Sequence, residues 1–108
     1  MDINSYDKAT KIYLDMEFTK FEQGEIISIG LVDQYGRTFY AVSDEFDKSL
    51  VSSWIGENVL PYLDENNADV VGSISTIKRR LLDWIGSYPK VEIWGDCVSH
   101  DWVYFTAL

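Results

Sequence analysis

Two acidic side chains, two residues apart, are the first candidates for chemistry in this sequence. Asp15 and Glu17 lie in the segment Lys11–Phe18, where apolar and polar residues alternate with the period of a strand that has one buried face. Both carboxylates therefore project from the same face. Close carboxylates are costly to ionise together without a cation or donors between them, so they are candidate ligands for Mg²⁺ or Mn²⁺, which prefer oxygen. The alternative is a solvated strand face, because acidic residues are frequent here and Glu45 and Asp47 form another such pair.

Asp101 is the third candidate ligand, because it opens an apolar run after the predicted strand Val91–Gly95. If that strand lies parallel to the first and beside it, Asp101 comes close to Asp15 and Glu17, and three carboxylates could hold two metal ions. Asp is also favoured at helix N-termini, so a capping role explains Asp101 equally well. Asp96 is either a fourth ligand or a loop residue at the end of the strand.

Other side chains with reactive or stacking groups are few. His100, the single histidine, is interpreted as bonded to backbone or solvent rather than as a catalytic base. Cys97 is the single cysteine, which excludes an intrachain disulfide and a cysteine-based zinc site. The basic cluster 78–80 fits a solvated helix face. Phe18, directly after Glu17, is the best candidate for a residue that stacks on a substrate base.

The composition bounds the class of protein. A chain of 108 residues and 12.4 kDa has the size of one domain. Its 46% hydrophobic and 15% aromatic residues are enough for a core, which excludes an intrinsically disordered protein. The formal net charge is −9. Because such a charge repels phosphate backbones, a general DNA- or RNA-coating role is excluded, whereas an enzyme whose carboxylates bind divalent cations is not.

The N-terminal residues lack the apolar stretch of a signal peptide, and no apolar run approaches the roughly 18 residues of a membrane span. We therefore expect a cytoplasmic protein with no membrane association. Residues 1–10 are predicted to be a flexible leader, and residues 11–108 a single domain.

The elements that position the candidate residues follow from local patterns. Strand patterns, a turn at 33–36 and a helix cap at Ser52 or Ser53 precede a longer helix that ends near Gly86, its expected C′ residue. This order predicts an α/β fold: a three-stranded antiparallel meander, a helical crossover and a fourth strand parallel to the first. The predicted strands are Lys11–Phe18, Glu25–Asp33, Arg37–Val42 and Val91–Gly95.

The order of these motifs resembles that of a known family. The motifs are Ile12-Tyr-Leu-Asp-Met-Glu-Phe18, Ile26-Ile-Ser-Ile-Gly-Leu-Val32, Phe39-Tyr-Ala-Val-Ser43 and Glu92-Ile-Trp94 followed by Asp101-Trp-Val103. They resemble those of the DEDD-type 3′–5′ exonucleases, and more narrowly of the small bacterial and phage exoribonucleases related to oligoribonuclease and RNase T. The resemblance implies an RNase H-like fold that acts on 3′ ends of single-stranded RNA with two Mg²⁺ or Mn²⁺ ions. Asp15 and Glu17 match its first motif and Asp101 its second.

The sequence departs from that family in its third motif, a general-base His followed by a fourth metal-binding Asp. Neither residue follows Asp101 before Leu108, and His100 precedes the second motif. The resemblance therefore implies the N-terminal portion of an exoribonuclease, with the C-terminal part of the fold missing and catalysis impaired. Such a chain would self-associate or need its missing C-terminal segment. The alternative is a catalytically inactive RNase H-like binding protein.

Overall fold

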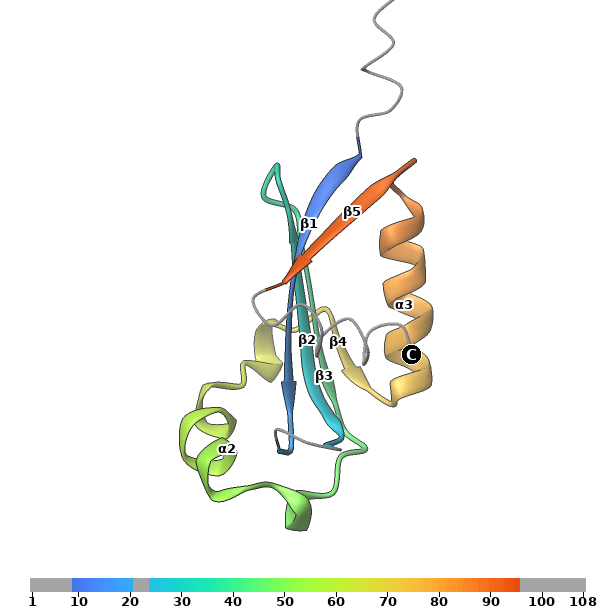
Figure 1. Ribbon diagram of the computed structural model, residues 1–108. Helices are drawn as coiled ribbons and strands as arrows, with labels where there is room; N and C mark the ends of the chain where they lie inside the picture. The colour runs from blue at the N-terminus through green and yellow to red at the C-terminus, as the bar shows by residue number, and fades with distance from the viewer. Residues whose placement is uncertain (1–8, 21–23, 96–108) are drawn as a thin grey trace, which may run out of the picture.

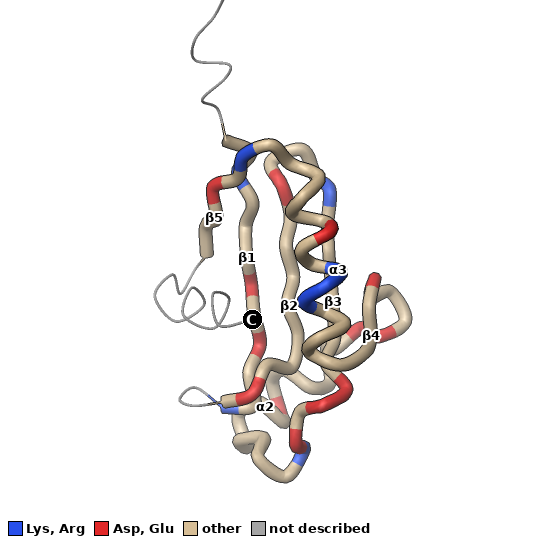
Figure 2. The backbone as a smooth tube through the Cα atoms, turned by 90° about the vertical axis from the view of Figure 1, so that its right-hand side faces the viewer, with Lys and Arg blue, Asp and Glu red and all other residues tan. Residues whose placement is uncertain are grey.

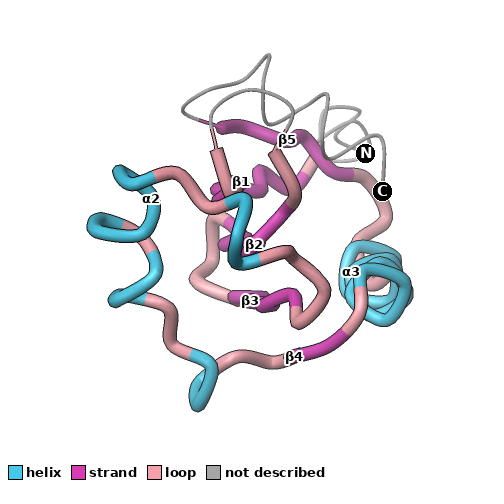
Figure 3. The backbone as a smooth tube through the Cα atoms, turned by 90° about the horizontal axis from the view of Figure 1, so that it is seen from below, coloured by secondary structure: helices cyan, strands magenta, loops and turns pink. Residues whose placement is uncertain are grey.

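The computed structural model describes residues 9–20 and 24–95, and within them five strands form one mixed sheet with the order β4-β3-β2-β1-β5 (Figure 1). Helices α2 and α3 lie on opposite sides of this sheet (Figure 3). No helix in the described ranges is both long and apolar enough to cross a membrane. The elements are β1 (Thr10–Phe18), β2 (Ile26–Asp33), β3 (Thr38–Ser43), η1 (Lys48–Leu50), α2 (Ser53–Asn58), η2 (Leu60–Tyr62), η3 (Glu65–Asn67), β4 (Val70–Gly72), α3 (Ile74–Gly86) and β5 (Val91–Gly95).

The first three strands form the predicted antiparallel meander. In β1 and β2, Ile12 lies opposite Asp33 and Asp15 opposite Gly30, and β2 continues into β3 through a tight turn. The turn requires Gly36, whose φ of 95° is unfavourable for residues with a side chain. Within the meander β1 is an edge strand, and it becomes an interior strand because β5 pairs with its residues 10–14.

The crossover also follows the prediction, because β5 pairs with β1 in parallel. The described strands include one that the sequence did not indicate: β4, three residues long, pairs in parallel with β3 at the far edge of the sheet. The strand predicted as the fourth is therefore the fifth. The mixed α/β architecture, its strand order and its pairing are consistent with part of an RNase H-like fold.

The main core lies between the sheet and α3. Ser73 caps α3, its hydroxyl oxygen accepting from the Thr76 backbone N–H at 3.2 Å, and the buried side of the helix presents Ile77 and Leu81. One expectation about this helix is wrong: Gly86 is its last residue, and Ser87 is the cap. The core cluster consists of Ile12, Leu14, Met16, Phe18, Ile29, Leu31, Phe39, Ala41, Val70, Ile77 and Leu81.

A second apolar cluster attaches α2 to the other side of the sheet. The register between β1 and β2 shifts between Glu17 and Phe18, and Ile27 packs with Ile55 and Val59 instead of joining the main core. Ser52 caps α2 as predicted, and its backbone N–H donates to the Thr19 carbonyl at 2.8 Å. The start of α2 is therefore tied to the end of β1.

The turn between β2 and β3 is joined to the C-terminal end of α3 through Asp33, which is 3% exposed. Its carboxylate accepts from the backbone N–H groups of Tyr35 and Arg37 at 2.8 and 2.9 Å, and from the Tyr88 hydroxyl at 2.7 Å. The Tyr88 bond is the largest cause of a lowered pKa of Asp33, which the backbone bonds lower further while burial opposes them. Burial first, and then the Asp33 carboxylate, raise the pKa of Tyr88 to about 12.

Candidate active site

Asp15 and Glu17 lie on the outer face of the sheet, defined here as the face of β1–β3 opposite α3. Their neighbours Leu14 and Met16 point to the main core and are 5% and 4% exposed, whereas Asp15 is exposed and Glu17 half-buried. The alternation of apolar and polar residues in the sequence therefore matches the alternation of buried and exposed side chains along β1. Both carboxylates lie on one face of the strand. Figure 2 shows acidic positions along β1, while basic positions lie on α3 across the sheet.

A pocket of about 310 Å³ opens beside these carboxylates. This volume is near the lower end of the about 300–1,000 Å³ typical of small-molecule sites, which suits a single small unit rather than a long polymer. Asp15 and Glu17 form one wall, and residues from the end of α2 and from η2 form another. The full lining consists of Asp15, Glu17, Ser28, Gly30, Tyr40, Asn58, Val59, Tyr62 and Leu63.

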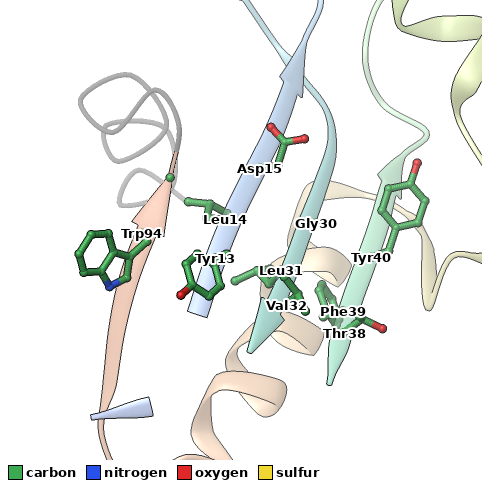
Figure 4. A pocket seen from close by; sticks show the side chains of 11 residues that line it. Tyr13, Leu14, Asp15, Gly30, Leu31, Val32, Thr38, Phe39, Tyr40 and Trp94 are labelled. Atoms are coloured by element: carbon green, nitrogen blue, oxygen red, sulfur yellow. The ribbon is translucent and has the colours of Figure 1, made fainter. Parts of the chain in front are cut away.

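A larger pocket of about 510 Å³ lies further along the outer face, toward β5, and is lined by exposed apolar side chains that include Tyr13 and Trp94. It shares Asp15, Gly30 and Tyr40 with the smaller pocket. Figure 4 shows Asp15 on β1 and Tyr40 on β3, with Gly30 on the strand between them. Asp15 therefore lies where the two pockets meet.

Gly30 keeps the space between Asp15 and Tyr40 open. A Cβ atom there would lie 3.9 Å from both the Asp15 carbonyl oxygen and a Tyr40 ring carbon, and the backbone is not in the left-handed region. Neither packing nor conformation therefore requires a glycine at this position. The irregularity in β2 occurs opposite Glu17 and Phe18, not at Gly30. The missing side chain leaves space at the residues that the two pockets share.

The donor chemistry of this site fits a hard divalent cation in part. Two carboxylates line the smaller pocket, and no Lys, Arg or His is among the described residues that line it. Oxygen ligands of this kind suit Mg²⁺ or Mn²⁺. Within residues 9–20 and 24–95, no group of three or more His, Cys, Asp or Glu side chains could hold a metal. The two carboxylates of β1 thus supply part of a coordination shell.

The remaining residues singled out from the sequence divide into two groups. Asp101, Asp96 and His100 lie outside the described residues. Phe18 lies in the main core, 7% exposed, on the opposite face of β1 from Asp15. The expectation that Phe18 stacks on a substrate base is corrected by this placement, because a ring packed against core side chains offers no free face to a base.

Sequence reasoning missed the second wall of the smaller pocket. Asn58 and Tyr62 reach it from the α2–η2 segment, of which the sequence predicts only the helix cap at Ser52 or Ser53, although Pro61 also lies in this segment. The sequence contained one signal, a tyrosine directly after that proline. It could not be read without knowing on which side of the sheet α2 packs.

Comparisons with known proteins show what the chain is similar to. No protein-family model matches the sequence. The chain is 35% identical over 98 residues to the 3′–5′ exoribonuclease Rv2179c of Mycobacterium tuberculosis, and equally to the 3′–5′ exoribonuclease MT2234.1 from a second strain of that organism. Each match covers 86% of this chain and 57% of the relative, so the chain spans little more than half the length of the curated relatives it matches. Over that span, the chain is similar to proteins named 3′–5′ exoribonucleases, in line with the resemblance of its motifs.

Proposed function

We propose that the protein is a metal-dependent 3′–5′ exoribonuclease of the DEDD type that shortens single-stranded RNA from its 3′ end. The observation that carries the proposal is the pairing of Asp15 and Glu17 on one wall of a small pocket, in a chain whose matched relatives are named 3′–5′ exoribonucleases. The proposal combines the two observations, because acidic pairs are frequent on strand faces and because the activity named for a relative is known only of that relative.

In this proposal the residues of β1 hold Mg²⁺ or Mn²⁺, and Asp101 completes the ligand set. When bound, such ions stabilise the charge that develops at the scissile phosphate and lower the pKa of a bound water. Asp15 and Glu17 fix the position of that charge because both residues pair with β2, opposite Gly30 and Ser28. The wall formed by α2 and η2 limits the space beside these carboxylates. The pocket therefore favours the end of an RNA chain over an internal nucleotide.

The net charge of −9 also shapes the proposal. An RNA strand approaching the outer face meets two carboxylates, so the protein binds it weakly unless cations are present. Long-range attraction to phosphates is absent. The proposed substrate is therefore a short single-stranded 3′ end held through metal ions. The cytoplasmic location and the self-association expected from the sequence stay predictions.

The test uses the protein expressed from its complete reading frame and a 5′-labelled oligoribonucleotide resolved on a denaturing gel. With Mn²⁺ or Mg²⁺ we expect a ladder of products shortened one nucleotide at a time, and a chelator should abolish it. Asp15→Asn and Asp101→Asn should each lower the rate about 100-fold or more, exceeding the about 10–100-fold effect of losing an outer-shell partner of a metal ligand.

Glu57→Gln is the matched charge control, because Glu57 is an exposed residue of α2 that is not part of the pocket lining. It removes the same charge a short distance away and should leave the ladder unchanged. Chelator-resistant trimming, or full activity in Asp15→Asn, would contradict the metal-dependent mechanism. Absence of trimming by the wild-type protein would favour the inactive binding protein instead.

A further inference from the structure

We infer that Tyr40 is a positioning residue that fixes the second wall of the smaller pocket and thereby restricts the site to the free end of an RNA chain. This wall consists of the lining residues Asn58, Val59, Tyr62 and Leu63. The inference rests on the proposed function and deepens it, because it assigns the selection of chain ends to a residue outside the proposed metal ligands.

The place of Tyr40 in the sheet is the first observation. It lines the smaller pocket from β3, where it is half-buried, and Gly30 lies on the strand between it and Asp15 (Figure 4). In the register of the sheet Tyr40 pairs with Gly30, which itself pairs with Asp15. These pairings fix the position of Tyr40 relative to the β1 carboxylates, so a segment bonded to Tyr40 is placed relative to Asp15 as well.

On its other edge the backbone of Tyr40 is bonded to Asp69. Strand β4 begins one residue later, at Val70, and its partner on β3 is Ala41, the residue after Tyr40. The Asp69 N–H donates to the Tyr40 carbonyl, and the Tyr40 N–H donates to the Asp69 carboxylate, both at 2.8 Å. The segment that returns from η2 to the sheet is thus fixed at its C-terminal end by two short bonds to Tyr40.

The side chain of Tyr40 holds the same segment closer to the pocket. Its hydroxyl oxygen accepts from the Asp64 N–H at 3.4 Å, and Asp64 directly follows Leu63, a lining residue of the wall. Leu63 is partly buried against the second apolar cluster. The wall is therefore packed against α2 on one side and bonded to β3 on the other, so the pocket is formed before a substrate binds, which lowers the cost of ordering on binding.

A wall held in this way limits what can lie beside Asp15 and Glu17. An RNA chain that continues past the carboxylates meets the wall, whereas a chain that ends there needs only the pocket of about 310 Å³. Without the bonds to Tyr40 the wall is free to move away from β1. The site should then bind an ordinary 3′ end less tightly and reject a bulkier 3′ end less strongly.

Kinetic measurements on the protein expressed from its complete reading frame test this inference. Mn²⁺-dependent trimming is compared for an oligoribonucleotide with an ordinary 3′ end and for one with a 2′-O-methyl group on its terminal ribose. Tyr40→Phe removes only the hydroxyl and should raise KM for the ordinary end about 2- to 10-fold, as expected for one hydrogen bond. It should leave kcat unchanged, because the carboxylates stay on β1, and should reduce the discrimination against the methylated end.

Two substitutions of Asp69 separate position from charge. Asp69→Ala removes the acceptor of the Tyr40 N–H and should raise KM, although the loss of a negative charge by itself favours RNA binding. Asp69→Asn removes the same charge but keeps an oxygen that can accept from the Tyr40 N–H, so its KM should not exceed that of the wild type. Tyr13→Phe is the matched control and should change nothing, because Tyr13 is an exposed tyrosine that lines only the larger pocket.

Hydrogen exchange supplies a readout that does not depend on activity. The Asp64 amide should exchange faster in Tyr40→Phe because it loses its acceptor. Unchanged KM and discrimination in Tyr40→Phe and Asp69→Ala would overturn the inference, as would an equal effect in Tyr13→Phe or unchanged exchange of the Asp64 amide. Failure of the proposed function has a different signature, because trimming then persists in Asp15→Asn while the exchange of the Asp64 amide still responds to Tyr40→Phe.

Discussion

Two aspartates of the same β-hairpin are held in opposite ways. Asp33, at the end of β2, is 3% exposed, and its carboxylate accepts three hydrogen bonds within the protein. Asp15, in the middle of β1, is exposed and lines both pockets of the outer face. One carboxylate is used to connect a turn to a helix, and the other faces space that a ligand can enter.

This difference shows how little the residue type alone says about role. The Asp33 carboxylate is surrounded by donors from its own turn, and the Arg37 guanidinium lies 5.0 Å from the Tyr88 ring and 5.7 Å from that of Trp84. The group therefore belongs to a closed polar and aromatic arrangement. Asp15 lines two pockets, and Gly30 beside it has no side chain to fill the space. We accordingly expect Asp33 to govern stability and Asp15 to govern activity.

The largest effect on stability in this comparison should come from Asp33→Ala. It removes at once the acceptor of two turn N–H groups and of the Tyr88 hydroxyl, in three part-buried hydrogen bonds, and donors shielded from water are costly to leave without partners. Thermal unfolding should show a melting temperature several degrees lower, whereas Asp15→Ala should change stability by no more than about 0.5 kcal/mol, as is usual for surface positions.

The pH dependence sharpens the same comparison. Because the pKa of Asp33 is lowered from 3.8, its contribution is present above that pH and is lost as the pH falls through the still lower folded-state pKa. The acid limb of the wild-type stability curve should therefore be steeper than that of Asp33→Ala. Equal melting temperatures of Asp33→Ala and wild-type protein, or a larger loss in Asp15→Ala, would reverse the roles assigned to these two residues.

A smaller effect is expected from Tyr88→Phe, which removes one of the three hydrogen bonds to Asp33 and keeps the ring. The wild-type pKa of Tyr88 is raised from 10.0 to about 12, so the neutral phenol is favoured in the folded state. Its contribution is fully present below pH 10.0 and is lost as the pH rises from there to about 12. Urea unfolding at pH 8 and in this alkaline window should show that the gap between wild type and Tyr88→Phe narrows at high pH. A constant gap would mean that the hydroxyl does not support Asp33.

The same two regions show what the sequence could reveal. The alternation around Asp15 predicts the face on which both β1 carboxylates lie, because the period of a strand is a local property. Gly36 predicts the turn that follows Asp33, because turn formation is also local. The bond from Tyr88 to Asp33 joins residues 55 positions apart, and no local pattern indicates it. The buried position of Phe18 is implied by the alternation itself, which places it on the face opposite Asp15.

Two further features depended on packing between distant elements. Strand β4 is three residues long, too short for a recognisable period, and it forms because β3 offers a free edge. The pocket wall at Tyr62 exists because the cluster around Ile55 attaches α2 to the outer face. In both cases the residues were visible in the sequence, whereas the neighbour that gives them a role was not.

Manganese binding tests the central claim, that the β1 carboxylates hold a divalent cation, most directly. Free Mn²⁺ is followed by its electron paramagnetic resonance signal during titration into wild-type protein, Asp15→Asn, Glu57→Gln and Asp33→Ala, at a temperature where all four are folded. We predict that Asp15→Asn weakens binding about 10-fold or more, because a lost ligand should cost at least as much as a lost outer-shell partner, and that the two other variants bind as the wild type does. Identical titrations of wild-type protein and Asp15→Asn would contradict the account.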